Sequence, residues 1–233
     1  MFFPPFNQDI SRYERKFVVS DMHYSGILQA VRNHPSAFGV IYHPRYINNI
    51  YFDSNDLDFF YDNVSGRGSR KKARIRWYGD LEGNIDKPVL EFKVREGYLG
   101  NKLSFPLKPF VLDDTFNTEV LKRVFADSEL PDWAFEVMQH LNPSLLNRYS
   151  REYFVSFDEK FRLTIDSDLS YHAIEPVHNS FLRSYRGEDF IVEVKYDFIN
   201  DKDAPFVTAN LPFRLTKSSK YVNGMELLYP QLM

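Results

Sequence analysis

The feature that most constrains the fold is the alternation of residue types between residues 71 and 93, KKARIRWYGDLEGNIDKPVLEFK. Successive side chains of a β-strand point to opposite faces, so Lys72, Arg74 and Arg76 share one face. The residues between them are apolar and share the other face. The alternation therefore predicts a strand with one cationic face and one apolar face.

A second alternating run, PVLEFKVRE, follows a turn that contains Gly83 and Asn84. It puts Glu91 and Lys93 on one face and apolar residues on the other, so the two runs together predict a β-hairpin. A single amphipathic hairpin is also compatible with a charged face that is simply exposed to water. The pattern in the rest of the chain is needed to decide whether the charged face of the hairpin is functional or is simply exposed to water.

Other segments show the same alternation, or the spacing of amphipathic helices. A strand with alternate basic residues followed by a Glu-x-Lys strand occurs at 74–93 and again at 151–195, as a repeat of pattern and not of sequence. Charged faces on so many strands favour closure into a barrel with a polar lumen and helices outside. Further strands are predicted at 12–19, 102–107, 147–157, 160–169 and 189–197, and helices after Ser20, at 115–126, at 132–141 and from Lys220.

A lumen lined by many Lys and Arg side chains would repel itself when empty, because like charges a few ångströms apart raise each other's energy. Such a lumen favours a polyanionic ligand. The formal net charge of the whole chain is only −3, so there is no overall attraction to nucleic acid, and a polyanion site must be local.

Composition narrows the class of protein further. With 233 residues, of which 43% are hydrophobic, the chain is long enough for one globular domain, which we expect over 1–233. Cysteine is absent, which excludes disulfides, thiolate metal sites and cysteine nucleophiles. The six histidines show no paired metal-ligand spacing, and no P-loop, kinase or Rossmann glycine pattern occurs.

The sequence contains no recognisable signal peptide and no recognisable membrane-spanning segment. No run reaches the roughly 18 apolar residues of a membrane span. The N-terminal stretch MFFPPFNQDI lacks the basic region of a signal peptide. We therefore expect a cytoplasmic protein without membrane insertion.

The motifs RYERKF, YFDSND, KARIRWYG, LEFK, RYSREYF, FRLTID, VEVK and KSSKY together resemble the VTC polyphosphate-polymerase domain. This domain is a branch of the triphosphate tunnel metalloenzyme, or CYTH-like, superfamily. The resemblance implies an α+β fold: an antiparallel, eight-stranded β-barrel, or tunnel, with a basic lumen and helices packed outside. It also implies a transferase that uses Mn or Mg to pass the terminal phosphoryl group of ATP to a growing polyphosphate chain.

The resemblance also assigns roles to single residues. Glu193 and Glu91 are expected to bind the metal, although each has an alternative role as an ion-pair partner: Glu193 of Lys195 or a lumen arginine, and Glu91 of Lys93 or a neighbouring arginine. Ser219 also has the position of a helix N-cap. The residues expected to hold phosphate are Lys72, Arg74, Arg76, Lys93, Lys102, Tyr149, Arg151, Arg162, Lys217, Ser219 and Lys220.

Two positions depart from the family pattern. Asn63 stands where eukaryotic members carry an arginine. In the E-x-E-x-K signature Glu14 and Lys16 are present, but Arg12 replaces the first glutamate, so fewer carboxylates remain for metal. Two other functions therefore stay open: a tunnel phosphohydrolase of tripolyphosphate or nucleoside triphosphates, and a non-catalytic polyphosphate-binding module. The expected partners are ATP and polyphosphate and not nucleic acid, while a membrane partner and the oligomeric state are left open.

Overall fold

The computed structural model describes residues 12–96, 99–179, 181 and 183–232. The stretch MFFPPFNQDI, in which no signal peptide was recognised, lies outside these residues. Among the described residues, no helix is long and apolar enough to cross a membrane.

The strands are β1 (Arg12–Val19), β2 (Gly39–Asp53), β3 (Ser69–Tyr78), β4 (Gly83–Ile85), β5 (Val89–Glu96), β6 (Leu99–Pro106), β7 (Phe110–Leu112), β8 (Asn142–Val155), β9 (Phe161–His172), β10 (Ser184–Arg186), β11 (Phe190–Asp197) and β12 (Leu215–Thr216). The helices are α1 (Tyr24–Arg32), α2 (Asp58–Val64), α3 (Thr118–Asp127), α4 (Asp132–Gln139), α5 (Ala204–Ala209) and α6 (Lys220–Leu228), with short 3₁₀ turns η2 (Phe198–Asn200) and η3 (Pro230–Leu232).

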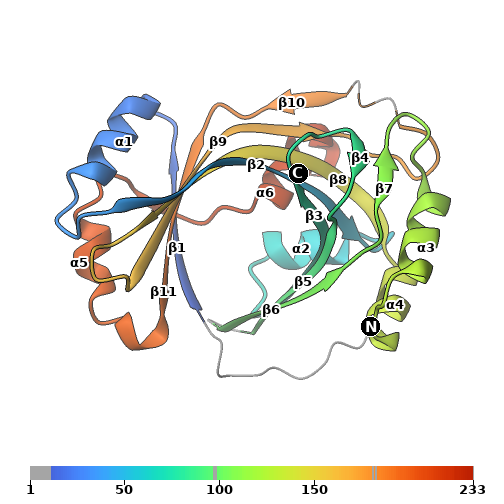
Figure 1. Cartoon of the computed structure of the whole chain (residues 1–233), viewed down its shortest axis with the longest axis horizontal. Coiled ribbons are helices and arrows are strands. Elements are labelled where there is room, and N and C mark those ends of the chain that lie inside the picture. Colours follow the sequence, from blue (N-terminus) through green and yellow to red (C-terminus); the bar gives the residue numbers. More distant parts are fainter. Residues whose placement is uncertain (1–11, 97–98, 180, 182, 233) are drawn as a thin grey trace.

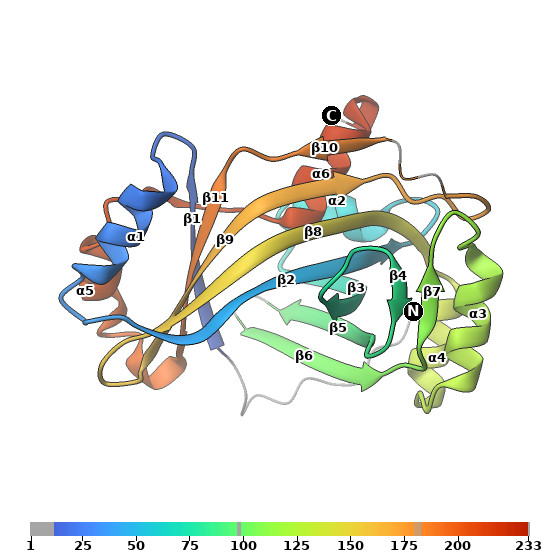
Figure 2. The same ribbon diagram turned by 45° about the horizontal axis from the view of Figure 1, so that its top comes forward.

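One strongly curved antiparallel sheet organises the molecule (Figures 1 and 2). Its strands follow the order β12-β1-β11-β9-β8-β2-β3-β5-β6, with β10 paired to β9, while β4 and β7 form a separate small sheet. The curvature brings β1 beside β6, but the described residues show no strand pairing between them. The α+β class with an antiparallel sheet is therefore confirmed, whereas a closed eight-stranded barrel is not.

The predicted hairpin forms, but its connection differs from the expected tight turn. Strands β3 and β5 pair with Arg74 directly opposite Glu91. Gly83 and Asn84 do not form the turn, because residues Gly83–Ile85 are β4 and pair with β7. The reason is Ile85, which is buried in the apolar core and therefore holds this segment against the molecule instead of letting it project as a turn.

Helices cover the convex face of the sheet in two places. Ala73, Ile75 and Trp77, the apolar residues of β3, are buried against α3 and α4. At the other end, apolar residues of β1, β9 and β11 are buried against α1 and α5. This arrangement confirms the predicted assignment of apolar residues to an outer, helix-covered face.

Helix α6 instead packs on the concave face, which corrects the expectation that all helices lie outside. Its Tyr221 and Met225 are buried in one cluster with Tyr51 and Tyr149, which lie on the concave side of β2 and β8. Tyr51 and Tyr221 stack with their ring centroids 5.2 Å apart. The concave face is apolar in this part of the sheet, so it has to be covered, and burying it brings the N-terminus of α6 next to the charged residues of the same face.

Candidate functional site

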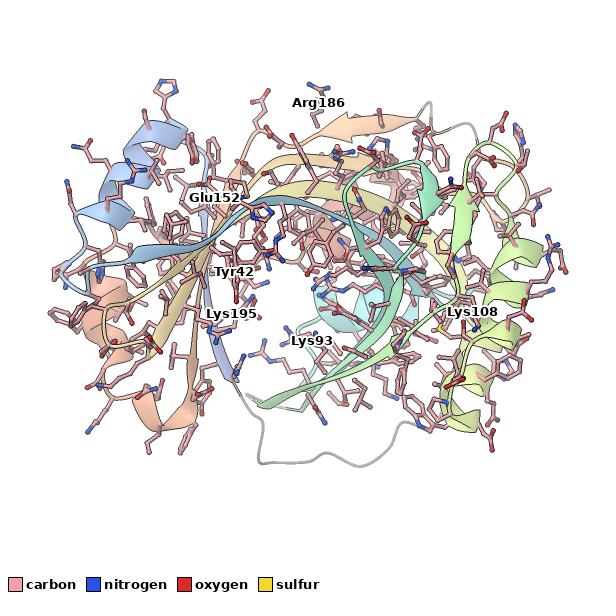
Figure 3. The ribbon with its side chains drawn as sticks, viewed as in Figure 1. Tyr42, Lys93, Lys108, Glu152, Arg186 and Lys195 are labelled. Carbon is pink, nitrogen blue, oxygen red and sulfur yellow. The ribbon has the colours of Figure 1, made fainter. Side chains whose placement is uncertain are left out.

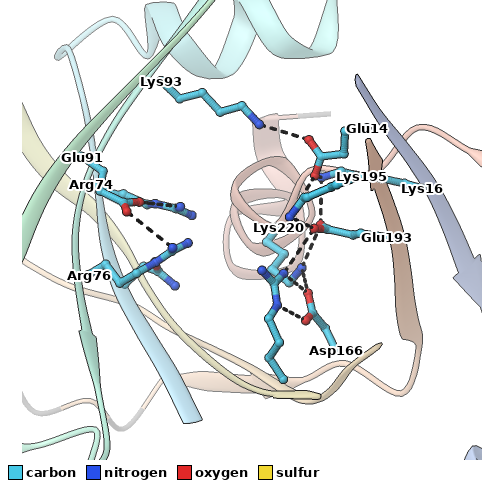
Figure 4. Close-up of polar contacts among 12 residues, drawn as sticks. Glu14, Lys16, Arg74, Arg76, Glu91, Lys93, Asp166, Glu193, Lys195 and Lys220 are labelled. Atoms are coloured by element: carbon cyan, nitrogen blue, oxygen red, sulfur yellow. Dashed lines mark hydrogen bonds and ion pairs between the residues drawn. The ribbon is translucent and has the colours of Figure 1, made fainter. Parts of the chain in front are cut away.

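Charged side chains gather on the concave face from two facing walls (Figure 4). One wall consists of β3, β5 and β6, and the other of β1, β9 and β11; the space between them is called the lumen here. Lys93 and Lys195 extend toward this space from opposite walls (Figure 3). The alternation in each strand explains the gathering, because the polar and charged residues of these strands share the concave face, whereas most of the residues between them are apolar and are buried on the other face.

Glu91 organises the first wall. It is buried on β5, and Arg74 donates to its Oε2 from Nη2 at 2.6 Å and from Nε at 2.8 Å. Its Oε1 lies 3.5 Å from Nη1 of Arg76 and 3.0 Å from Nζ of Lys102. Burial alone would raise the pKa of Glu91, but the surrounding cations, Arg74 foremost, lower it below its ordinary value. Glu91 is therefore ionised and orients three of the predicted phosphate-binding residues.

Glu193 has the same position in the second wall. It is buried on β11, with Nζ of Lys195 at 2.8 Å, Nζ of Lys16 at 3.1 Å and Nη2 of Arg151 at 3.3 Å. Burial would raise its pKa, but Lys16 and Lys195 hold the pKa of Glu193 well below its ordinary value. The alternative that the sequence left open, an ion pair with Lys195, is present.

Asp166 on β9 is a residue that the predicted site did not include. It is fully buried and accepts two hydrogen bonds from Arg151, from Nε at 2.5 Å and from Nη2 at 2.6 Å. Lys220 at the start of α6 also donates to Asp166. The sequence did contain a signal, because Asp166 shares the polar face of the alternating run FRLTID with Thr164.

Glu14 connects the two walls. The E-x-E-x-K signature identified Glu14 and Lys16 in the sequence, but neither they nor Lys195 were assigned to the predicted site. Lys93 of β5 reaches Oε2 of Glu14 on β1 at 3.1 Å, and Lys16 and Lys195 lie 3.4 and 3.8 Å from Oε1. Burial raises the pKa of Glu14, but Lys16 and the other lysines lower it to about 2. The expectation of a self-repelling lumen is therefore met only in part, because four carboxylates offset some of its positive charge but are outnumbered by the cations: Glu14, Glu91, Asp166 and Glu193.

Lys72 differs from the other lumen cations because its contact is not a carboxylate. Its Nζ donates to Oγ of Ser219 at 2.8 Å, and the same oxygen accepts from the backbone N–H of Val222 at 3.3 Å, which caps α6. Burial, together with the charges of Lys16 and Lys93, holds the pKa of Lys72 well below 10.5. This part of the lumen thus has excess positive charge beside a helix N-terminus, which is the environment that stabilises a bound anion.

Tyr149 lies between the lumen charges and the core. Its ring is 1% exposed, with Cζ of Arg151 at 5.2 Å and Nζ of Lys220 at 4.6 Å from the ring centroid. Burial would raise its pKa, but Arg151 and Arg76 lower the pKa of the Tyr149 phenol. The ring of Tyr149 therefore contacts both Arg151 and Lys220 and keeps the two cations close to each other.

Two predicted phosphate-binding residues lie outside the ion-pair clusters of the two walls. Arg162 on β9 is exposed and lines a cavity at the end of the lumen. Lys217 is exposed directly after β12, and neither residue forms an ion pair within the described part of the chain. Asn63, which replaces the family arginine, donates to the carbonyl of Phe59 at 2.7 Å inside α2.

Comparison with known proteins decides the family. The family model described as the VTC domain matches residues 11–229, nearly the whole chain. The chain belongs to the VTC domain family. Subunit 4 of the vacuolar transporter chaperone complex of Schizosaccharomyces pombe is 25% identical over 230 residues, which cover 78% of this chain and 32% of that protein. The present VTC domain therefore spans about a third of the length of that relative.

Solved structures agree on the fold of this VTC domain. A protein from Pyrococcus horikoshii superposes with a TM-score of 0.53 at 13% identity, over 93% of this chain and 99% of that one. A protein from Bacillus halodurans described as a candidate adenylate cyclase gives a TM-score of 0.53 at 14% identity, over 94% of this chain and 100% of that one. A protein from Hippeastrum described as having a dominant triphosphatase activity gives 0.50 at 14% identity, over 93% and 96%.

The donors available for a metal in this VTC domain are few. Glu91 and Glu193, the two expected ligands, lie on opposite walls, whereas Glu14 lies beside Glu193 and shares Lys16 and Lys195 with it (Figure 4). In the described residues, no group of three or more His, Cys, Asp or Glu is arranged to hold a metal. Mg²⁺ commonly binds through one or two carboxylates together with substrate phosphates, and Glu14 with Glu193 fits this smaller donor set.

Proposed function

We propose that this VTC domain is a metal-dependent polyphosphate polymerase that transfers the terminal phosphoryl group of ATP to a growing polyphosphate chain. The observation that supports it most is the convergence of cations from both walls and from α6 on one space. Together the two walls of the curved sheet would surround a phosphate chain on several sides, as expected for a tunnel that holds such a chain. We also propose that the sheet acts as the eight-stranded tunnel of the family and that 1–233 works as one domain.

Phosphoryl transfer needs positioning and charge neutralisation more than covalent help from the protein. Arg74, Arg76 and Arg151 present guanidinium groups, which bind phosphate oxygens in pairs, and Lys72 and Lys220 add point charges. The arginines and Lys220 contact carboxylates, but a guanidinium carries five N–H donors, so each arginine can bind a phosphate through its remaining donors and keep its carboxylate contact, which leaves no buried carboxylate unpaired.

In the proposed reaction, the terminal oxygen of the chain forms a bond to the γ-phosphorus of ATP. The bond from this phosphorus to the β–γ bridging oxygen breaks, and ADP leaves with the electron pair. Arg74 and Arg76 would hold equatorial oxygens of the transferred group, where negative charge is spread in the transition state. A divalent ion, Mn or Mg, held by Glu14 and Glu193 would supply further neutralisation of the phosphate oxygens.

Two other functions could use the same site, and a different feature of the lumen favours each of them. The side chains of Lys93 and Lys102 are 49% and 53% exposed, so water reaches the lumen and could replace the chain as acceptor, which favours a phosphohydrolase. The pairing of all four lumen carboxylates with Lys or Arg favours a module that binds polyphosphate without turnover.

The test is incubation of the purified protein with γ-labelled ATP and Mn, followed by separation of polyphosphate, orthophosphate and ADP. We expect labelled polyphosphate that requires the metal. Arg74→Ala and Arg76→Ala should each reduce its formation about 100-fold, the usual loss when one buried donor to a transferred group is removed. Arg95→Ala is the matched control, because Arg95 lies on β5 but is exposed and its removal should change the rate little.

The product distribution separates the three functions. Labelled orthophosphate without chain growth would identify a phosphohydrolase. Polyphosphate that binds in the presence of a chelator, with no nucleotide turnover, would identify a binding module. If the protein neither bound nor turned over any phosphate compound, all three functions would be overturned.

A further inference from the structure

The end of the lumen beyond Arg151 carries several aromatic side chains in addition to charged ones. Along β8 the residues on the concave face follow in the order Tyr149, Arg151 and Tyr153, and a strand advances about 3.3 Å per residue. Tyr149 is covered by α6, and Arg151 lies among the charged residues. Tyr153 is therefore roughly 7 Å farther from α6 than Arg151, at the mouth of the lumen.

A bulge in β2 turns a second tyrosine toward the same mouth. Tyr42 pairs with Tyr153, and Arg45 pairs with Arg151, so three steps along β2 correspond to two steps along β8. In a regular strand, Tyr42 and Arg45 would point to opposite faces, but the extra residue puts both on the concave face. Pro44, which has no N–H to donate, lies within the bulge, where a proline is tolerated.

These tyrosines form an aromatic wall around Arg45. The Cζ of Arg45 lies 5.0 Å from the ring centroid of Tyr42, 5.8 Å from that of Tyr153 and 5.9 Å from that of Tyr78. Within the described residues Arg45 forms no ion pair, so its charge is held by ring faces alone. Tyr42 and Tyr78 remain 51% and 54% exposed, which leaves aromatic surface free at the mouth.

A cavity of about 270 Å³ adjoins this wall. Tyr42, Tyr153 and Thr164 line it together with Arg151 and Lys195, two residues of the charged clusters. Thr164 is 7% exposed, and its hydroxyl has no hydrogen-bond partner among the residues that the structure describes. A buried hydroxyl without a partner costs free energy, so this group favours a ligand that supplies a hydrogen bond.

We propose that this mouth cavity binds the nucleoside of the nucleoside triphosphate, with the base against Tyr42 and Tyr153 and a ribose hydroxyl or base edge on Thr164. The inference rests on the proposed use of ATP. Arg151 and Lys195 belong both to the cavity and to the charged clusters, so they would receive the phosphates nearest the ribose. The terminal phosphate then points inward, toward Arg74, Arg76 and Lys72, where transfer takes place.

Aromatic stacking tolerates different bases, because every base has a π-face. The wall therefore discriminates nucleoside triphosphates from bare tripolyphosphate more than it discriminates adenine from guanine. This is a property that phosphate contacts alone cannot produce, since both ligands carry the same three phosphates.

The experiment compares binding of ATP and of tripolyphosphate, each with Mn, to the full chain by calorimetry. Tyr42→Ala should weaken ATP binding about tenfold and leave tripolyphosphate binding unchanged, and Tyr42→Phe should retain the wild-type affinity for both. Thr164→Val should weaken ATP binding several-fold with no effect on tripolyphosphate. Tyr46→Ala is the matched control, because this exposed tyrosine lies on β2 but packs against Arg148 on the convex face.

Each outcome decides the proposal. Equal weakening of both ligands by Tyr42→Ala would show that the mouth binds the phosphate chain, and unchanged affinity for both would show that it binds neither; either result overturns the nucleoside site. Wild-type protein that binds tripolyphosphate but not ATP would overturn it as well, while leaving a polyphosphate function standing. Wild-type protein that binds neither ligand would instead overturn the proposed function itself.

Discussion

Lys72 shows how one residue of the lumen departs from its neighbours. Arg74 on the same face donates to Glu91, and Lys16 on the opposite wall contacts Glu14 and Glu193. Lys72 instead donates to the hydroxyl of Ser219, and other cations lie near it. The alternation of the sequence predicted the face on which Lys72 lies, but alternation is a property of one strand and says nothing about which groups approach from α6.

The lowered pKa of Lys72 makes a prediction for stability. Since its pKa in the folded protein is below 10.5, the folded state binds this proton less tightly than the unfolded chain does. The resulting loss of stability is full below the folded pKa, declines as pH rises toward 10.5 and disappears above it. Lys72→Met should therefore raise the thermal midpoint at neutral pH, and the difference from wild type should shrink as pH increases.

The measurement is thermal unfolding of both proteins across this pH range in a buffer without phosphate. Lys122→Met, on the exposed surface of α3, serves as the control and should give a small difference that does not depend on pH. A Lys72→Met midpoint below that of wild type at neutral pH would show that the contact with Ser219 outweighs the burial of the charge.

At the scale of single elements, the sequence predicted strands best where alternation was regular. The faces of β3, β5, β9 and β11 are as expected, and α6 begins after Ser219 as its capping position indicated. The helix predicted after Ser20 instead begins at Tyr24, because His23 and not Ser20 is in the N-cap position. The repeated pattern is not a structural repeat either, since β3 and β5 are neighbours whereas β9 separates β8 from β11.

Gly224 explains how closely α6 approaches the sheet, and it gives a test of that element. A Cβ at this position would lie 2.5 Å from Cδ1 of Tyr171 and 2.6 Å from Cδ2 of Leu145. Alanine is favoured over glycine in a helix by about 1 kcal/mol, but overpacking of a core costs about 1–3 kcal/mol. We expect Gly224→Ala to lower the free energy of unfolding and to move α6 away from β8, which displaces Ser219 and Lys220.

Urea denaturation and tripolyphosphate binding measure the two effects of Gly224→Ala. Both stability and affinity should fall, whereas Gly39→Ala should change neither, because an added Cβ there has no described atom within 4 Å. An unchanged tripolyphosphate affinity in a destabilised Gly224→Ala protein would show that the start of α6 is not part of the phosphate site.

For the whole molecule, the sequence predicted an antiparallel α+β fold with charges on one side, and it missed how these charges are balanced. The cations were recognised because Lys and Arg alternate with apolar residues, as in KARIRW. Asp166 was not assigned, because its importance arises only when β9 and the distant α6 come together. Glu14 was recognised only as part of the E-x-E-x-K signature, because its contact with Lys93 depends on the approach of β1 to β5. The approach of the two sheet edges could not be predicted from strand patterns, since Glu14 and Lys93 bridge the walls where the described strands β1 and β6 do not pair.

We propose that the concave face binds a chain of phosphates between its two walls. A crystal structure of the protein with tripolyphosphate and Mn tests this most directly. We expect phosphate oxygens within hydrogen-bond distance of Arg74 and Arg76 on one wall and of Arg151 on the other. Tripolyphosphate bound on the convex face, or a lumen without ligand at saturating concentration, would contradict it.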